Sequence, residues 1–104
     1  PWDEAVLRAE IDHTDLIINC TSVGMKRTDP SPLPSSLLQP HLIIYDTIYT
    51  ANRTKLMLAA DEAGARSANG LSMLLHQGAL AFEIWFNRPA PLDAMKAALL
   101  ATGV

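Results

Sequence analysis

Residues 16–25 have the sequence LIINCTSVGM, in which an apolar run is followed by polar residues and a glycine. The apolar, β-branched run at 16–18 predicts a short strand buried on both faces. The polar residues after it and Gly24 predict a turn at the carboxyl end of that strand. Residues 42–46, LIIYD, repeat the pattern of an apolar run that ends at a polar side chain. Between the two runs lies a proline-rich loop, with one helical turn expected near residues 36–38.

Apolar residues at helical spacing continue the pattern downstream. Residues 56–63 predict a helix with Gly64 as its left-handed cap, and residues 65–68 predict a third strand. A long helix is expected from Leu71 to near Asn87. Strands that alternate with helices indicate an α/β fold, with a short parallel sheet of about three strands flanked by helices. Ligands bind such sheets at the carboxyl ends of the strands.

A closing helix is predicted after Pro91, which suits the first turn of a helix. Its inner face is expected to carry Leu92, Met95 and Leu99. The chain has 104 residues, 49% of them hydrophobic, which is enough for one modest core. A start at Pro1 without Met indicates a segment of something longer.

Charge and cysteine usage exclude several classes of partner. The net charge is −3, and the eight Lys and Arg are scattered from Arg8 to Lys96, so no nucleic acid partner is expected. Cys20 is the only cysteine, which rules out an internal disulfide and fits a cytoplasmic setting. Its position after the strand predicts a small packing residue. No apolar run approaches a membrane span, and the three histidines lack the spacing of a metal site.

Three segments, taken in order, resemble shikimate dehydrogenases. Residues 19–25, NCTSVGM, are similar to the family's N-[AC]-T-x-x-G-M turn. Residues 46–49, DTIY, followed by Thr54, resemble its D-x-x-Y-x(4)-T segment. Residues 69–79, NGLSMLLHQGA, resemble its G-L-x-M-L-x-x-Q-x-A helix. Two family prolines are Ala51 and Lys55 here, so the backbone of that loop is less constrained.

The resemblance implies the second half of a Rossmann-like NAD(P)-binding domain across residues 1–104. It also implies hydride transfer between NADP(H) and shikimate or 3-dehydroshikimate, a step of aromatic amino-acid biosynthesis. The residues that would border the cofactor are Asn19, Thr21, Thr47, Gly70 and Met73. The residues that would contact the small-molecule substrate are Tyr49 and Gln77. We expect Thr21, Tyr49, Gly70 and Gln77 to line one cleft.

Ordinary structural roles remain open for the same residues. Gly70, Met73 and Gln77 share one helix face, but spacing alone also allows Met73 in the core and Gln77 in solvent. Tyr49 suits an amphipathic cover for the sheet. Thr21 suits a hydroxyl that bonds the backbone of its own turn.

Two parts of such an enzyme do not occur in the sequence. It contains no G-x-G-x-x-G turn and no Lys-Asp pair in a context that would protonate an alkoxide. In the family these belong to the opening βαβ unit and to an amino-terminal substrate domain. We therefore expect no catalytic residue in this chain and no dehydrogenase activity from it alone. An exposed strand edge at residues 16–19 would also allow pairing with a second copy.

Two other functions fit the same sequence. One is a quinate/shikimate dehydrogenase that uses NAD, because the segment that reads the 2′-phosphate of NADP is not in the chain. The other is a non-catalytic, dehydrogenase-like module that senses metabolites of the pathway. In a longer parent protein, a catalytic lysine and a glycine-rich turn before this segment would favour the enzyme. Their replacement by other residues would favour the sensor.

Overall fold

The computed structural model describes residues 3–50 and 52–102 of the chain. Its elements follow one another as α1 (Glu4–Ile11), β1 (Leu16–Asn19), the 3-10 turn η1 (Ser35–Leu37), β2 (Ile43–Asp46), α2 (Lys55–Ala63), β3 (Arg66–Asn69), α3 (Leu71–Phe86) and α4 (Leu92–Ala101). The three predicted strands, the helical turn and the three predicted helices are all present, with bounds shifted by a residue or so. No helix in the described ranges has both the length and the apolar character needed to cross a membrane.

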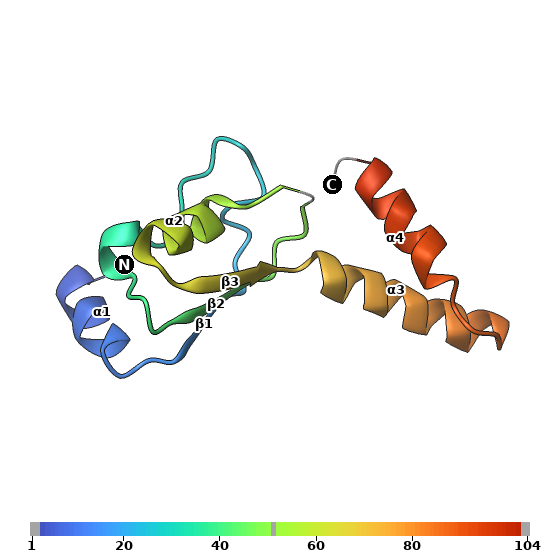
Figure 1. Cartoon of the computed structure of the whole chain (residues 1–104), viewed down its shortest axis with the longest axis horizontal. Helices are drawn as coiled ribbons and strands as arrows, with labels where there is room; N and C mark the ends of the chain where they lie inside the picture. Colours follow the sequence, from blue (N-terminus) through green and yellow to red (C-terminus); the bar gives the residue numbers. More distant parts are fainter. Residues whose placement is uncertain (1–2, 51, 103–104) are drawn as a thin grey trace.

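The strands form one parallel sheet in the order β1-β2-β3 (Figure 1). The register aligns Asn19 with Asp46 and Asp46 with Asn69. The α/β prediction is therefore confirmed, and the last residues of all three strands form one polar row. This row places three hydrogen-bonding side chains at the edge where parallel sheets bind their ligands.

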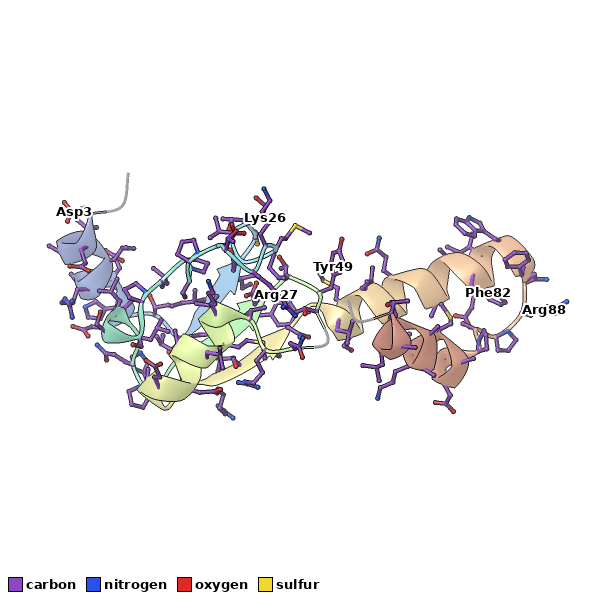
Figure 2. All side chains as sticks on the ribbon, turned by 90° about the horizontal axis from the view of Figure 1, so that it is seen from above. Asp3, Lys26, Arg27, Tyr49, Phe82 and Arg88 are labelled. Carbon is purple, nitrogen blue, oxygen red and sulfur yellow. The ribbon has the colours of Figure 1, made fainter. Side chains whose placement is uncertain are left out.

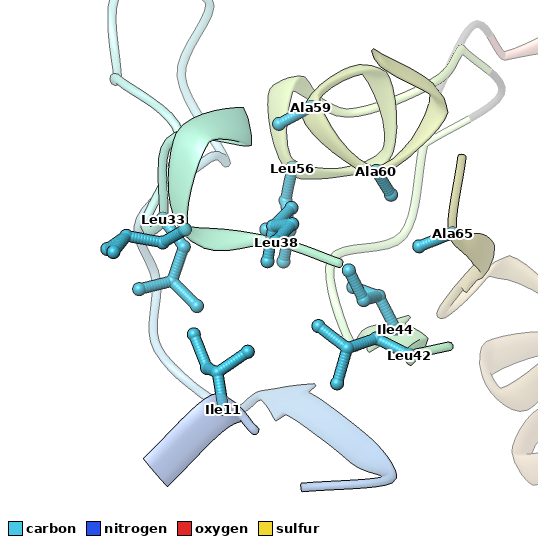
Figure 3. Packing of buried hydrophobic residues seen from close by; sticks show 10 residues of the cluster. Ile11, Leu33, Leu38, Leu42, Ile44, Leu56, Ala59, Ala60 and Ala65 are labelled. Atoms are coloured by element: carbon cyan, nitrogen blue, oxygen red, sulfur yellow. The ribbon is translucent and has the colours of Figure 1, made fainter. Parts of the chain in front are cut away.

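The hydrophobic core covers one face of the sheet (Figure 3). Leu42, which directly precedes β2, and Ile44 of β2 are both almost fully buried and pack with Leu56 and Ala60 of α2. Ile11 of α1 belongs to the same cluster. Burial of each large aliphatic side chain stabilises the fold by about 1.5–3 kcal/mol, so this cluster holds the sheet under α2.

The opposite face of the sheet is exposed, which corrects the prediction that the first strand is buried on both faces. Leu16 and Ile18 each remain 50% exposed, and their neighbour Ile43 is 43% exposed. Only Ile17 and Asn19 of this strand turn toward the covered side. The run is apolar on both faces, but the described helices pack against only one of them.

The helix α1 was not predicted from the sequence. Asp3 caps it, because its carboxylate accepts hydrogen bonds from the backbone N–H groups of Ala5 and Val6. Leu7 and Ile11, four residues apart, face the core. An Asp N-cap before an i, i+4 apolar pair is the signal that would have identified this helix.

Gly64 and Asn87 end their helices as predicted. Gly64 has φ 77° and Asn87 has φ 49°, both in the left-handed region that terminates helices. At its start, α2 is capped by the hydroxyl of Thr54, which accepts a hydrogen bond from Met57 N.

The helices α3 and α4 extend away from the sheet as a hairpin (Figure 1). Met95 of α4 lies against Gly78 of α3, close enough that a Cβ on Gly78 would be 3.4 Å from Met95 Cε. The expected inner face of α4 is only partly covered, since Leu92 is 41% exposed and α4 contains no buried residue. On α3 only Ala79 is buried.

Candidate functional site

The polar row is held together by a buried carboxylate. Asp46 is fully buried, and its Oδ1 accepts hydrogen bonds from Asn19 Nδ2 (3.0 Å) and from Ile48 N (3.2 Å). Asn19 Nδ2 also donates to the carbonyl of Val23 at 3.1 Å. Asp46 thus fixes the first two strand-end loops relative to each other. Asp46 belongs to a family motif, but its role in linking the two loops was not predicted from the sequence. A carboxylate at the end of a buried strand is a signal for such a hydrogen-bonding role.

Thr21 is part of a hydrogen-bonded turn. Asn19 Oδ1 accepts from both the N–H and the hydroxyl of Thr21, at 3.1 and 2.7 Å. The hydroxyl of Thr21 in turn accepts from Val23 N at 3.1 Å. The turn role considered for Thr21 is therefore present, and its side chain is also exposed to solvent. Cys20, expected as a packing residue, is exposed instead, because the strand end leaves it outside the core.

Gly70 packs directly on the backbone of Thr47. A Cβ at Gly70 would lie 2.2 Å from the Thr47 carbonyl oxygen, so only glycine fits. Gly70 N donates to the carbonyl of Ile48 at 2.9 Å. The hydroxyl of Thr47 donates to the carbonyl of Asn19 at 2.6 Å. The structure therefore joins Asn19, Thr21, Thr47 and Gly70 in one connected set of contacts at the carboxyl ends of the strands.

Asn69 fixes the entry into α3. Its Oδ1 accepts from Leu71 N at 3.1 Å, and its Nδ2 donates to the carbonyl of Thr50 at 2.7 Å. This side chain links the start of α3 to the loop that carries Tyr49. Its role was missed in the sequence, where an Asn before Gly at a strand end indicates an Asx turn.

Met73 and Gln77 follow Gly70 along α3 and point into solvent. Met73 is 47% exposed, so the alternative that placed it in the core is wrong for the described chain. Gln77 is exposed as well. Both side chains are available to a ligand that lies along α3.

Tyr49 lies on a cavity of about 500 Å³ between two loops. Figure 2 shows Tyr49 in the same region as Lys26 and Arg27. Its lining comprises Gly24, Met25, Lys26, Arg27, Ile48, Tyr49, Thr50, Asn52, Arg53, Thr54 and Lys55. Thr21, Gly70 and Gln77 do not line this cavity, so the four residues expected around one cleft are not brought together by it. Ala51, one of the departures from the family pattern, lies outside the described residues.

Four cations line the cavity, although the sequence shows them scattered. Lys26 and Arg27 come from the first loop, and Arg53 and Lys55 come from the second. They are half of the eight Lys and Arg in the chain. The sequence does not show this grouping, because the fold brings together residues that lie 26 to 29 positions apart.

Two acids lie next to these cations without lining the cavity. Asp61 receives two hydrogen bonds from Arg53, at 2.8 and 2.6 Å. Asp29 Oδ2 accepts from Gly24 N and Lys26 N, at 3.0 and 3.1 Å. The backbone hydrogen bonds from Lys26 and Gly24 lower the pKa of Asp29 below its usual value. Lys55 Nζ donates to the carbonyl of the same Asp29 at 2.5 Å.

Metal-binding side chains do not gather within residues 3–50 and 52–102, where no group of three or more His, Cys, Asp or Glu could hold an ion.

Comparisons with known proteins match most of this chain to shikimate dehydrogenases. A family model described as the Shikimate 5'-dehydrogenase C-terminal domain matches residues 70–100. A curated NADP(+) shikimate dehydrogenase of Symbiobacterium thermophilum is 44% identical over 96 residues, which are 90% of this chain and 33% of that protein. The chain thus spans about a third of the length of the curated relatives it matches.

Solved structures agree in fold. The shikimate 5-dehydrogenase of Listeria monocytogenes in complex with shikimate and NAD is 40% identical with a TM-score of 0.76, over 93% of this chain and 34% of that one. A shikimate dehydrogenase in complex with NADP+ is 32% identical with a TM-score of 0.83, over 94% of this chain and 35% of that one. By sequence and by the arrangement of its strands and helices, the chain belongs to the shikimate dehydrogenase family.

Proposed function

We propose that this chain forms part of an NADP-dependent shikimate dehydrogenase and supplies walls of its cofactor and substrate sites. The reaction would be reversible hydride transfer between NADP(H) and shikimate or 3-dehydroshikimate. Within such an enzyme, residues 1–104 would be the second half of the cofactor domain with its closing helices. The match of 90% of the chain to about a third of an NADP(+) shikimate dehydrogenase supports this assignment.

The observation that carries the proposal is the contact between Gly70 and Thr47. The missing side chain at Gly70 lets α3 begin directly on the Thr47 carbonyl. This close approach places the start of α3 against the end of the second strand, at the strand ends where ligands of parallel sheets bind. A residue with a Cβ at this position would collide with the Thr47 backbone and push α3 away from it.

The roles of the individual residues follow from their places. Asn19, Thr21, Thr47 and Gly70 would border the cofactor, and the exposed thioether of Met73 would pack against its ring. Gln77, a turn further along α3, would exchange hydrogen bonds with the hydroxyl groups of the substrate. The phenol of Tyr49, 41% exposed, would contact the substrate from the neighbouring loop. Bound NADP(H) would supply or accept the hydride.

We propose no catalytic acid or base within this chain. Asp46 is the carboxylate of the polar row, but it is fully buried and held by Asn19 and Ile48. The hydroxyls of Thr21 and Thr47 are occupied by local hydrogen bonds. The isolated chain should therefore position ligands without turning them over, since a hydride step also needs a proton donor near the substrate oxygen.

NAD is a second candidate cofactor. The Listeria monocytogenes structure, 40% identical to this chain, holds shikimate and NAD. The polar row offers no cationic side chain that would favour the 2′-phosphate of NADP over the free hydroxyl of NAD. A direct comparison of the two cofactors in one assay decides between them.

A fusion tests the proposal. The chain would replace the matching third of the Symbiobacterium thermophilum enzyme, and shikimate-dependent reduction of NADP+ and NAD+ would be followed at 340 nm. We expect activity in the fusion and none in the chain alone. Activity of the isolated chain would overturn the assignment of catalytic groups. A folded fusion that binds neither cofactor nor shikimate would overturn the proposed function.

We also propose that the isolated chain associates through β1. This strand lies at the edge of the described sheet, with β2 on one side only. Its backbone groups on the other side are available to a strand of a second copy. The exposed side chains of Leu16 and Ile18 would be partly covered in such a pair.

A further inference from the structure

The cavity beside Tyr49 has a charge pattern that the proposed dehydrogenase function does not use. Lys26, Arg27, Arg53 and Lys55 line it, and no Asp or Glu does. This is unusual in a chain with eleven acidic residues and a net charge of −3. Like charges that converge on one hollow repel one another, so the arrangement favours an anionic ligand.

The neighbouring acids neutralise only part of this charge. Asp61 pairs with Arg53, and Asp29 lies near Lys26 and Lys55. Two positive charges therefore remain in excess around the cavity. A ligand with one negative charge would leave part of the excess uncompensated, whereas a ligand with two or more would balance it.

Hydrogen-bond donors are available at the same place. The side chains of Lys26 and Arg27 are exposed and donate to no group within the described residues. Arg53 uses Nε and Nη2 for Asp61 and Ser67, which leaves its Nη1. The amino-terminal end of α2, a helix of nine residues, opens at Thr54 and Lys55 and adds its partial positive charge.

From this arrangement we propose that the cavity binds a diphosphate group carried by a small molecule. Guanidinium groups bind phosphate oxygens in a bidentate manner, and ammonium groups add point charges. A volume of about 500 Å³ is in the range of small-molecule sites and holds a diphosphate with an organic group attached. Met25 supplies apolar surface for that organic group.

Calorimetric titration of the full chain with inorganic pyrophosphate tests the site. The double variant K26A/R27A removes two exposed cations whose side chains donate no hydrogen bond within the described residues, so folding should be retained and is checked by circular dichroism. Loss of each charge-assisted hydrogen bond should weaken binding about tenfold. The matched control R66A/K96A removes two exposed cations elsewhere, on β3 and α4, and should leave the affinity within about twofold.

Titrations with ADP and adenosine identify the source of the diphosphate. Tighter binding of ADP than of pyrophosphate, both weakened by K26A/R27A, would assign a nucleotide-type ligand. Equal binding of the two would assign the diphosphate alone. Absence of pyrophosphate and ADP binding, equal losses in the control variant, or adenosine binding as tightly as ADP would each overturn the proposal. None of these measurements depends on hydride transfer, so their outcome is independent of the proposed function.

Discussion

The amide of Asn19 donates to the buried carboxylate of Asp46 at 3.0 Å, across the carboxyl ends of the first two strands. This bond fixes the position of the first loop relative to the second. The other carboxylate oxygen of Asp46, Oδ2, is buried without a hydrogen-bond partner among the described residues. Oδ1 therefore accepts the hydrogen bonds that hold the two loops together, whereas Oδ2 accepts none among the described residues. Substitutions can test the two oxygens separately.

Asp46→Ala should lower the free energy of unfolding by about 2–4 kcal/mol, because it leaves Asn19 Nδ2 and Ile48 N without their acceptor. Asp46→Asn keeps an oxygen for both donors and places its amide where Oδ2 had no partner. It should cost less than the alanine variant by about 1 kcal/mol or more. Urea denaturation of the three proteins measures both differences, and equal stability of Asp46→Ala and the unmodified chain would contradict the role of this carboxylate.

Gly70→Ala should destabilise the chain by about 1–3 kcal/mol, because the new methyl group meets the Thr47 carbonyl at 2.2 Å. Gly78→Ala is the matched control within α3. Its methyl group meets only the flexible end of Met95, at 3.4 Å, and a helix interior favours Ala over Gly by about 1 kcal/mol. Thermal unfolding should therefore give opposite shifts, and two equal losses would argue against a special contact at Gly70.

The carboxylate of Asp29 should make the free energy of unfolding of the chain depend on pH. Its folded-state pKa is depressed, first by the backbone hydrogen bond from Lys26 and then by that from Gly24. Its contribution is therefore present above the ordinary value of 3.8 and is lost as pH falls through the lower folded-state pKa. Asp29→Asn should be less stable than the unmodified chain at pH 7, with a gap that narrows as pH drops below 3.8.

Urea midpoints at several pH values measure that gap. Glu62→Gln, an exposed position on α2, provides the control for loss of one negative charge. A gap for Asp29→Asn that stays constant down to pH 2.5 would show that its backbone hydrogen bonds do not favour the ionised form.

Gln77→Ala in the fusion enzyme should raise the KM for shikimate about fivefold to tenfold, the effect of losing one or two hydrogen bonds to the substrate. The KM for NADP+ should stay within twofold. His76→Ala, the exposed neighbour that points to another side of α3, is the control and should change neither value. An equal change in both KM values for Gln77→Ala would indicate a shift of α3 instead of a lost substrate contact.

Association through the edge of β1 should be visible by light scattering at high concentration as a dimer of the isolated chain. Ile18→Lys places a charge beside that edge and should return the species to a monomer. Leu80→Lys, at a somewhat more exposed position on α3, should leave the dimer intact. A monomer before any substitution, or a dimer broken only by Leu80→Lys, would exclude the edge as the contact.

Local signals account for what the sequence predicted well. Gly64 and Asn87 end their helices because both residues tolerate the left-handed backbone, and this requirement can be read one residue at a time. The three polar strand ends were also predictable, since Asn19 and Asp46 follow apolar runs and Asn69 ends the predicted third strand. Their alignment in one row then follows from parallel pairing.

What the sequence did not predict depends on contacts between distant residues. Lys26 and Lys55 line one cavity only because the two loops meet in space, and no window of sequence contains both. The exposure of Leu16 and Ile18 was missed for a similar reason, since an apolar run does not show which of its faces is covered. The role of Asp46 required knowledge of its partner across the strand pair.

The contact of Gly70 with Thr47 sets the direction in which α3 leaves the sheet. The 16 residues of α3 span about 24 Å at 1.5 Å per residue, and the helix leaves the sheet at Gly70. A tilt of about 5° at this joint would carry the far end of α3 through roughly 2 Å and Gln77 through about 1 Å. Misplacement of about 1 Å can slow an enzyme on the order of a hundredfold. If Gln77 contacts the substrate as proposed, a glycine two turns away would set its position relative to that substrate.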